Sequence, residues 1–284
     1  MDLSACTGLG DVKLVLTDFD YTFLNSGHVA SKANAKAFGE LTAAGITAAV
    51  ASGRSRIGTL SCLSSSCKDL MRYNGYPGIF LNGGVVYGED GTLLSRTDIT
   101  DSAQAVLLEK MKEMGILHNV LGYTPDRVIC IEKNAYTWKS SLEYKEPPPE
   151  VLSFDEFAET KFVKLVACST VESTDIARPI LEKAVRGHLR CVRPLDWNLE
   201  FINPSVSKAV GAKVLLGSLG LSPHHLLAMG DGENDIQILK LAGISVSVAN
   251  ACDAAKYAAL YSTVSCDDSA FQVVAECVLK PRRR

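Results

Sequence analysis

Apolar runs that end in polar residues recur along this chain and constrain its fold more than any other feature. Three of them are "KLVLTDFD" from Lys13, "ITAAVASGR" from Ile46 and "HLLAMGDG" from His225. A continuous apolar run of this kind is typical of a strand buried on both faces of a parallel sheet. Ligands of open α/β sheets bind beyond the carboxyl ends of the strands, where these polar residues would lie.

Segments with helical features separate the apolar runs. "SKANAKAFGELTAAG" has a candidate N-cap at Ser31 and a helix-ending glycine at Gly45. We expect further helices at "RIGTLSCLSSSC", "SKAVGAKVLLGSLG", "NDIQILKLAG", "DAAKYAA" and "SAFQVVAECVL", and a strand with a hairpin in "GIFLNGGVVYGEDGTLLS". Strands that alternate with helices predict an α/β fold, with a doubly wound, Rossmann-like parallel-sheet core.

The middle of the chain has a different pattern. Between residues 98 and 200, helical segments are mixed with strands of alternating character, including "RVICI", "FVKLVAC", "LRCVRPL" and "WNLEFI". This mixture predicts an α+β cap domain, residues 98–200, inserted into a core made of residues 1–97 and 201–284.

Composition excludes several classes of protein. The net charge of −3 gives no reason to expect nucleic acid or an anionic membrane as a partner. No apolar run reaches the roughly 18 residues of a membrane helix, and the first residues lack the pattern of a signal peptide. The nine cysteines are odd in number and form no paired metal-binding motif, which favours reduced thiols and a cytoplasmic location.

The polar clusters at the strand ends combine carboxylates with anion donors. They are Asp18, Asp20 and Thr22, then Ser52, Gly53 and Arg54, then Lys208 at a helix start, and finally Asp231, Asn234 and Asp235. Carboxylates crowded at one edge repel each other and need a cation, and a set of oxygen ligands suits Mg²⁺. Acids, a lysine and hydroxyl donors around one spot predict a phosphoryl-transfer site.

These residues also resemble a known family. "DFDYT", "ASGR", "SK" at Ser207–Lys208 and "GDGEND" are similar, in order, to the four motifs of the haloacid dehalogenase superfamily. "FLNGG" and "SVANACDAAKYAA" resemble accessory motifs of its Cof-type, class IIB sugar-phosphatase branch. The resemblance covers both halves of the core and not the middle insert.

The resemblance implies a role for each motif residue. Asp18 would be the nucleophile, and Asp20, oriented by Thr22, would act as general acid and base, which requires a raised pKa. Mg²⁺ would be held by Asp18, the backbone carbonyl of Asp20, Asp231 and, mostly through water, Asp235. The phosphoryl oxygens would be bound by Ser52, Gly53 and Lys208, and the phosphate or its waters by Asn234. The residues that touch the substrate or shape its pocket would be Arg54 and Asn82.

Several of these residues have simpler interpretations. Arg54 could be a surface ion-pair partner, Asn82 a turn residue before two glycines, and Asp235 a charge at a helix start. Lys208 could be an ordinary solvated lysine. The pair His224-His225 has no partner motif, so we interpret it as a surface or capping pair.

Tyr21 departs from the family pattern, in which glycine often follows the second aspartate. Glycine could serve a positive φ there, which a tyrosine adopts only at a cost. We therefore expect an ordinary φ at Tyr21. Its ring would pack under the neighbouring segment or line the mouth of the pocket, and we favour packing.

The sequence thus predicts a Mg²⁺-dependent phosphomonoester hydrolase that acts on a sugar phosphate or a similar small metabolite through an aspartyl-phosphate. Two alternatives stay open. One is a phosphomutase of related fold, and the other is a catalytically silent protein that binds a phosphorylated metabolite. The substrate and the oligomeric state cannot be inferred from the sequence.

Overall fold

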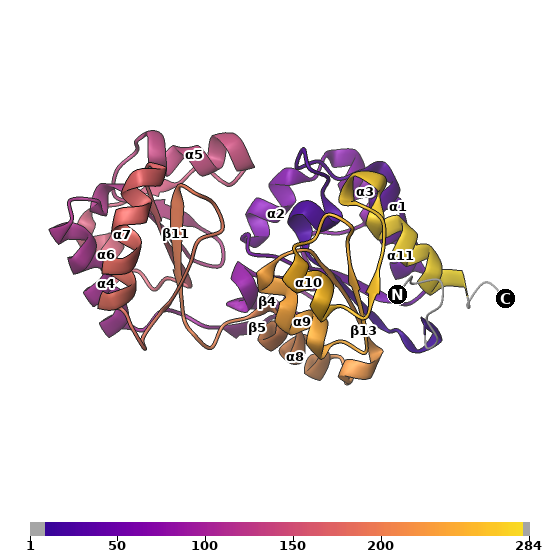
Figure 1. Cartoon of the computed structure of the whole chain (residues 1–284). Coiled ribbons are helices and arrows are strands. Elements are labelled where there is room, and N and C mark those ends of the chain that lie inside the picture. Colours follow the sequence, from indigo (N-terminus) through magenta and orange to yellow (C-terminus); the bar gives the residue numbers. More distant parts are fainter. Residues whose placement is uncertain (1–8, 281–284) are drawn as a thin grey trace. The chain divides into compact units, whose positions relative to one another are not determined.

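The computed structural model describes residues 9–280 and consists of two units, which divide between Ser95 and Arg96 and again between Val206 and Ser207. The sequence placed these divisions after residues 97 and 200. Residues 1–8, where the sequence analysis looked for the pattern of a signal peptide, lie outside the described residues. Each unit has its own sheet, drawn in Figure 1.

The core unit contains an eight-stranded sheet within the described residues. Its strands are β1 (Leu14–Thr17), β2 (Thr47–Ala51), β3 (Gly78–Phe80), β4 (Val85–Tyr87), β5 (Leu93–Arg96), β12 (Leu226–Gly230), β13 (Ile244–Ser247) and β14 (Tyr261–Ser262). They lie in the order β14-β13-β12-β1-β2-β3-β4-β5, and the pairs from β14 to β3 are parallel. The antiparallel β3–β4 pair follows, and the expected Glu-Asp-Gly turn lies between β4 and β5.

Helices cover both faces of this sheet. They are α1 (Lys32–Ala43), α2 (Arg56–Cys62), α3 (Ser65–Met71), α8 (Lys208–Ser218), α9 (Ile236–Leu241), α10 (Asp253–Ala258) and α11 (Ala270–Leu279). The connections β1-α1-β2 and β12-α9-β13 run in opposite directions across the sheet, so right-handed crossovers place α1 and α9 on opposite faces. Helices α3 and α11 pack on α1, and α8 and α10 on α9 (Figure 1). The predicted doubly wound α/β fold is confirmed.

One predicted helix is wrong in its extent. "RIGTLSCLSSSC" forms two helices, because α2 ends at Cys62 and α3 begins at Ser65. The side chain of Ser64 accepts a hydrogen bond from the backbone N–H of Cys67 and so caps the second helix. Serine competes for backbone hydrogen bonds in this way, and this capping ends one helix and starts the next. By contrast, Ser31 caps α1 as expected.

The second unit contains a six-stranded sheet in its described residues. The strands are β6 (Val120–Tyr123), β7 (Val128–Cys130), β8 (Glu150–Val151), β9 (Lys164–Cys168), β10 (Arg190–Val192) and β11 (Asn198–Ile202). Their order is β10-β11-β9-β6-β7-β8, and only the β7–β8 pair is parallel. This mainly antiparallel sheet is the α+β pattern that the sequence predicts.

Four helices accompany the second sheet. They are α4 (Asp101–Glu113), α5 (Ala135–Tyr144), α6 (Phe154–Glu159) and α7 (Val171–Ala184). Helix α4 packs on α6 and α7, over an apolar cluster that includes Leu107, Phe157, Phe162, Leu181 and Phe201. Because this cluster is separate from that of the core unit, each unit has its own hydrophobic core. Among residues 9–280, none of the helices has both the length and the apolar character that a bilayer crossing requires.

Candidate active site

Three neighbouring strand ends and one helix start form the candidate site. Asp18 follows β1, Ser52 follows β2 and Asp231 follows β12, and β1 pairs in parallel with both β2 and β12. The carboxyl ends of these strands therefore meet at the same edge of the sheet. Lys208 opens α8, which is capped by the Ser207 side chain.

Lys208 connects two of the aspartates. Its Nζ atom donates hydrogen bonds to Oδ1 of Asp18 and, over 2.7 Å, to Oδ1 of Asp235. Only 1% of Lys208 is exposed, so it is not a solvated surface lysine. A close backbone approach holds this helix start in place, because a Cβ at Gly83 would lie 2.1 Å from the carbonyl oxygen of Ser207.

The turn after β12 is organised by Asp235. Its Oδ2 atom accepts hydrogen bonds of 3.0 Å from the backbone N–H groups of Asp231 and Gly232. Asp235 is fully buried, so it is more than a solvated charge at a helix start. The Oδ1 atom of Asp231 accepts a 3.0 Å hydrogen bond from Thr22. The prediction that Thr22 orients Asp20 finds no support here, since the hydroxyl donates to Asp231.

The side chains of Asp18, Asp231 and Asp235 form a cluster suited to a cation. One carboxylate oxygen of each lies within 4.8 Å of the others. Burial raises the pKa of Asp18 well above its ordinary value, with Asp235 and Asp231 adding to the effect and Lys208 opposing it. Burial also raises the pKa of Asp231. Three carboxyls thus lie close together while one ammonium group contacts two of them, and this hard oxygen set fits Mg²⁺.

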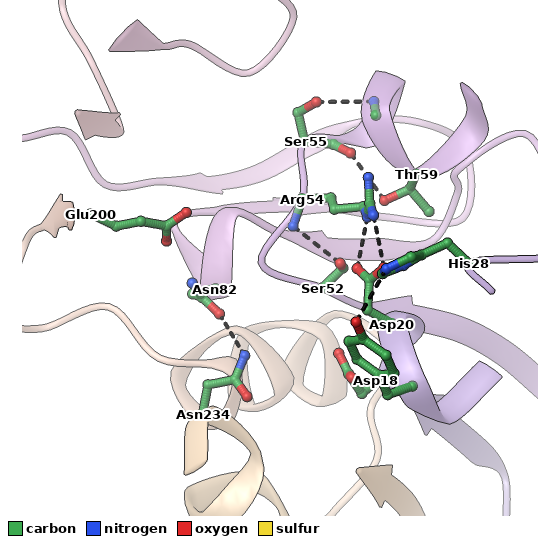
Figure 2. Close-up of polar contacts among 12 residues, drawn as sticks. Asp18, Asp20, His28, Ser52, Arg54, Ser55, Thr59, Asn82, Glu200 and Asn234 are labelled. Atoms are coloured by element: carbon green, nitrogen blue, oxygen red, sulfur yellow. Dashed lines mark hydrogen bonds and ion pairs between the residues drawn. The ribbon is translucent and has the colours of Figure 1, made fainter. Parts of the chain in front are cut away.

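Asp20 is held by two basic side chains (Figure 2). Arg54 donates to both carboxylate oxygens, each over 2.7 Å, and Nδ1 of His28 lies 2.9 Å from Oδ1. Burial alone would raise the pKa of Asp20, but the hydrogen bonds and charges of His28 and Arg54 lower it to about 2. The expected raised pKa is therefore wrong for this geometry.

Arg54 differs from one of its interpretations. It forms an ion pair, but it is only 7% exposed, so the pair is not a surface one. Its guanidinium group binds Asp20, and its role toward the substrate or the shape of the pocket stays a prediction. A bidentate contact of this kind fixes the plane of the carboxylate.

The predicted phosphate-binding residues lie around the same edge. Ser52 is buried, and its hydroxyl oxygen accepts a 3.1 Å hydrogen bond from the backbone N–H of Arg54. Asn234 donates to Oδ1 of Asn82 over 3.1 Å, which Figure 2 also shows. A Cβ at Gly53 would lie 3.3 Å from the Asn82 amide, so these three residues are close together. Asn82 has a φ of 58°, a left-handed conformation that asparagine tolerates.

Tyr21 is the clearest correction to the sequence analysis. Its φ is 54° and its ψ is 10°, so it adopts the left-handed conformation that we did not expect. This conformation costs a non-glycine residue about 1–2 kcal/mol. The amide of Asn250 donates to the backbone oxygen of Tyr21 over 2.8 Å and supports the turn. The ring packs edge-on against His28, yet 40% of the residue stays exposed.

His28 is the residue that sequence reasoning missed. It lies in the short segment between β1 and α1, outside all four motifs. The sequence did contain a signal for His28, since this histidine follows Asp20 by eight residues in a segment that starts at the site. The pair His224-His225 agrees with its interpretation as a surface or capping pair. Nδ1 of His225 lies 3.1 Å from the backbone nitrogen of Ser222 in a capping arrangement.

Comparison with known proteins places this geometry in a family. The family model of haloacid dehalogenase-like hydrolases matches residues 15–274. A solved structure described as a HAD/COF-like hydrolase from Plasmodium vivax is 25% identical, with a TM-score of 0.89, and the match covers 96% of this chain and 97% of that one.

Two curated relatives have more specific names. The chain is 31% identical to "Endoribonuclease YBEY, chloroplastic" of Arabidopsis thaliana over 89% of its own length, but it spans only 44% of that protein. It is 24% identical to "5-amino-6-(5-phospho-D-ribitylamino)uracil phosphatase YcsE" of Bacillus subtilis, and this match covers 95% of the chain and 97% of that protein.

Proposed function

Because the chain belongs to the family of haloacid dehalogenase-like hydrolases, we propose that it is a Mg²⁺-dependent phosphomonoester hydrolase that works through an aspartyl-phosphate. The observation that carries the proposal is the contact of Lys208 with Asp18 and Asp235. A buried ammonium group beside a buried carboxylate neutralises charge where an anionic substrate would bind. The names of the similar phosphatases support the same reaction class.

In the first step, a carboxylate oxygen of Asp18 attacks phosphorus, and the bond between phosphorus and the ester oxygen breaks. The ester oxygen takes a proton from Asp20 as it leaves. The pKa of Asp20 is about 2 in this geometry, but the negative charge of a bound phosphate would raise it and favour uptake of that proton.

In the second step, water attacks the phosphorus of the aspartyl-phosphate. The bond from phosphorus to the Asp18 oxygen breaks, inorganic phosphate leaves, and the water proton passes to Asp20. Lys208, Ser52 and the backbone N–H of Gly53 would hold the phosphoryl oxygens, while Asn234 would contact the phosphate or its waters.

Bound Mg²⁺ would neutralise charge on the phosphoryl oxygens. It would be held by Asp18, the carbonyl of Asp20, Asp231 and, through water, Asp235. The carboxylates of Asp18, Asp231 and Asp235 already cluster. Thr22 would keep Asp231 in place through its hydrogen bond.

We assign substrate selection to the second unit, residues 96–206. The core segment between β1 and α1 is short, and the reaction must keep water away from the aspartyl-phosphate until hydrolysis. Groups of the substrate that are distant from phosphorus would bind this unit, in the way that substrates contact the lids of other enzymes. The proposed substrate is a sugar phosphate or a similar small phosphorylated metabolite, and the ribitylaminouracil phosphate in the relative's name is one member of that class.

Phosphate release from p-nitrophenyl phosphate, with and without EDTA, tests the proposal. Release that stops with EDTA and returns with added Mg²⁺ is the expected result. A phosphomutase would release little inorganic phosphate from a panel of sugar phosphates, and a silent binding protein would release none. We also propose a cytoplasmic location, supported by the nine cysteines, which are odd in number and form no paired metal-binding motif.

A further inference from the structure

We propose that His28 is a positioning residue that holds the carboxyl of Asp20 in the orientation needed to protonate the leaving group, and that Tyr21 braces His28 for this task. The observation behind the proposal is a chain of contacts from Tyr21 through His28 to Asp20. The inference rests on the proposed function, because it concerns the acid step of that reaction.

The hydrogen bonds fix the arrangement of the histidine ring. Nδ1 of His28 lies 2.9 Å from Oδ1 of Asp20, and Nε2 lies 3.2 Å from the hydroxyl of Tyr21. An ionised carboxylate only accepts, so Nδ1 must carry the proton that is donated to Asp20. The hydroxyl of Tyr21 contacts Nε2 on the other side of the ring, so the imidazole is held between Asp20 and Tyr21.

The backbone around this chain of contacts is strained at both supporting residues. Tyr21 and His28 have φ values of 54° and 55°, in the left-handed region that favours glycine. Their rings nevertheless meet edge-to-face with centroids 5.0 Å apart. Strain of this kind persists where contacts with the surrounding structure hold the residue in place, and it occurs often at functional sites. The contact with Asp20 explains why two non-glycine residues occupy these positions.

The loop that carries His28 is itself firmly built. The side chain of Asn25 accepts hydrogen bonds from the backbone N–H groups of Gly27 and Val29, at 3.1 and 2.9 Å. Ser26 donates from both its N–H and its hydroxyl to Asp267. The imidazole is therefore presented by a rigid turn, and it reaches Asp20 from a different segment than Arg54 does. Because the two donors come from independent segments, a movement of one segment leaves the carboxyl held by the other.

Two substrates whose leaving groups differ in acidity can distinguish a positioning role of His28 from a purely structural one. Nitrophenolate departs without a proton, whereas an alkoxide needs one from the general acid. The probes are p-nitrophenyl phosphate and glycerol 2-phosphate, and the readout is the ratio of their kcat/KM values. This ratio is internally normalised, since partial unfolding of a variant lowers both values equally.

The variants follow from the geometry. His28→Ala should lower the glycerol phosphate to nitrophenyl phosphate ratio by about 10-fold or more, approaching the loss of about 10²-fold or more expected for Asp20→Asn. His28→Asn should keep the ratio within about threefold of wild type, because its amide can take the place of Nδ1 and asparagine tolerates a left-handed φ. Tyr21→Phe should produce a smaller fall than His28→Ala.

Lys36→Ala is the control. Lys36 is exposed within α1, the helix that follows this loop, so the ratio of this variant should equal that of the wild type. If His28→Ala leaves the ratio unchanged or raises it while Asp20→Asn lowers it, the positioning role of His28 is refuted and the proposed function stands. If Asp20→Asn itself leaves the ratio unchanged, the acid role of Asp20 in the proposed function fails.

Discussion

The Nζ atom of Lys208 lies 2.7 Å from Oδ1 of Asp235, and both side chains are fully enclosed by protein. Lys208 also contacts Asp18, so one ammonium group faces two carboxylates. Burial would lower the pKa of Lys208, but the charges of Asp18 and Asp235 outweigh it and raise the pKa. Lys208 therefore stays charged at neutral pH, and both the stability of the site and its affinity for anions depend on it.

Lys208→Met should destabilise the protein by about 3–5 kcal/mol at neutral pH, because it leaves buried carboxylates without a partner. Burial raises the pKa of Asp18, so its carboxyl takes up a proton more readily as the pH falls below neutral, and the loss should then shrink. Added MgCl₂ should restore part of the lost stability. Thermal unfolding measures all three effects.

Lys213→Met is the control for this experiment, since Lys213 is exposed on the same helix, α8. It should change stability little under any of these conditions. A Lys208→Met protein as stable as the control, with no response to MgCl₂, would contradict the charge balance described for the site.

Asp20 should also contribute stability that is lost on acidification, at a lower pH. Its folded-state pKa of about 2 is below the ordinary value, so the contribution is fully present above the unfolded pKa and is lost as the pH falls from about 4 to about 2. At pH 7 the wild type should exceed Asp20→Asn by about 2 kcal/mol in unfolding free energy. Denaturant titrations at several pH values should show this gap closing on acidification, and a gap independent of pH would be evidence against the Arg54 and His28 contacts.

Position 21 allows the backbone strain to be measured. Tyr21→Gly and Tyr21→Ala both remove the ring, but only glycine relaxes the left-handed φ. The glycine variant should therefore be more stable than the alanine variant by about 1 kcal/mol. The same pair at Lys36, exposed within α1, should show the reverse order by a similar amount. Equal stabilities of the two variants at position 21 would mean that the turn is not strained.

Removal of residues 96–206, with a short Gly/Ser linker in their place, tests the assignment of specificity to the second unit. Circular dichroism should show that the remaining α/β unit folds, because it has its own hydrophobic core. It should still cleave p-nitrophenyl phosphate slowly, and it should lose discrimination among phosphorylated metabolites. If this shortened protein ranks a metabolite panel as the full chain does, specificity lies in the core.

The sequence predicted the parts of the site that follow from strand pattern. Asp18, Ser52 and Asp231 each come directly after an apolar run, and parallel strands necessarily bring such positions to one edge of the sheet. Lys208 was recognisable because it stands at the start of a helical segment. These relations depend on local chemistry and sheet topology, which a sequence pattern records.

The choice of hydrogen-bond partner was not predictable in the same way. Thr22 binds Asp231 across 209 sequence positions, and Arg54 binds Asp20, a partner that we did not expect. Such choices depend on side-chain directions in three dimensions, which periodicity does not encode. The φ of Tyr21 was predicted wrongly because we inferred conformation from residue preference, and here the contacts with Asn250 and His28 outweigh that preference.

Acid quench of the enzyme within milliseconds of mixing with substrate, followed by mass spectrometry of its peptides, tests the central claim most directly. Acyl phosphates survive acid, so the account predicts one added phosphoryl group on the peptide that contains Asp18. Hydroxylamine should remove it, and the Asp18→Asn protein should neither carry it nor keep more than about 1% of wild-type turnover. Rapid turnover with no phosphoryl group on that peptide at any quench time, or an Asp18→Asn protein that stays active, would contradict covalent catalysis by Asp18.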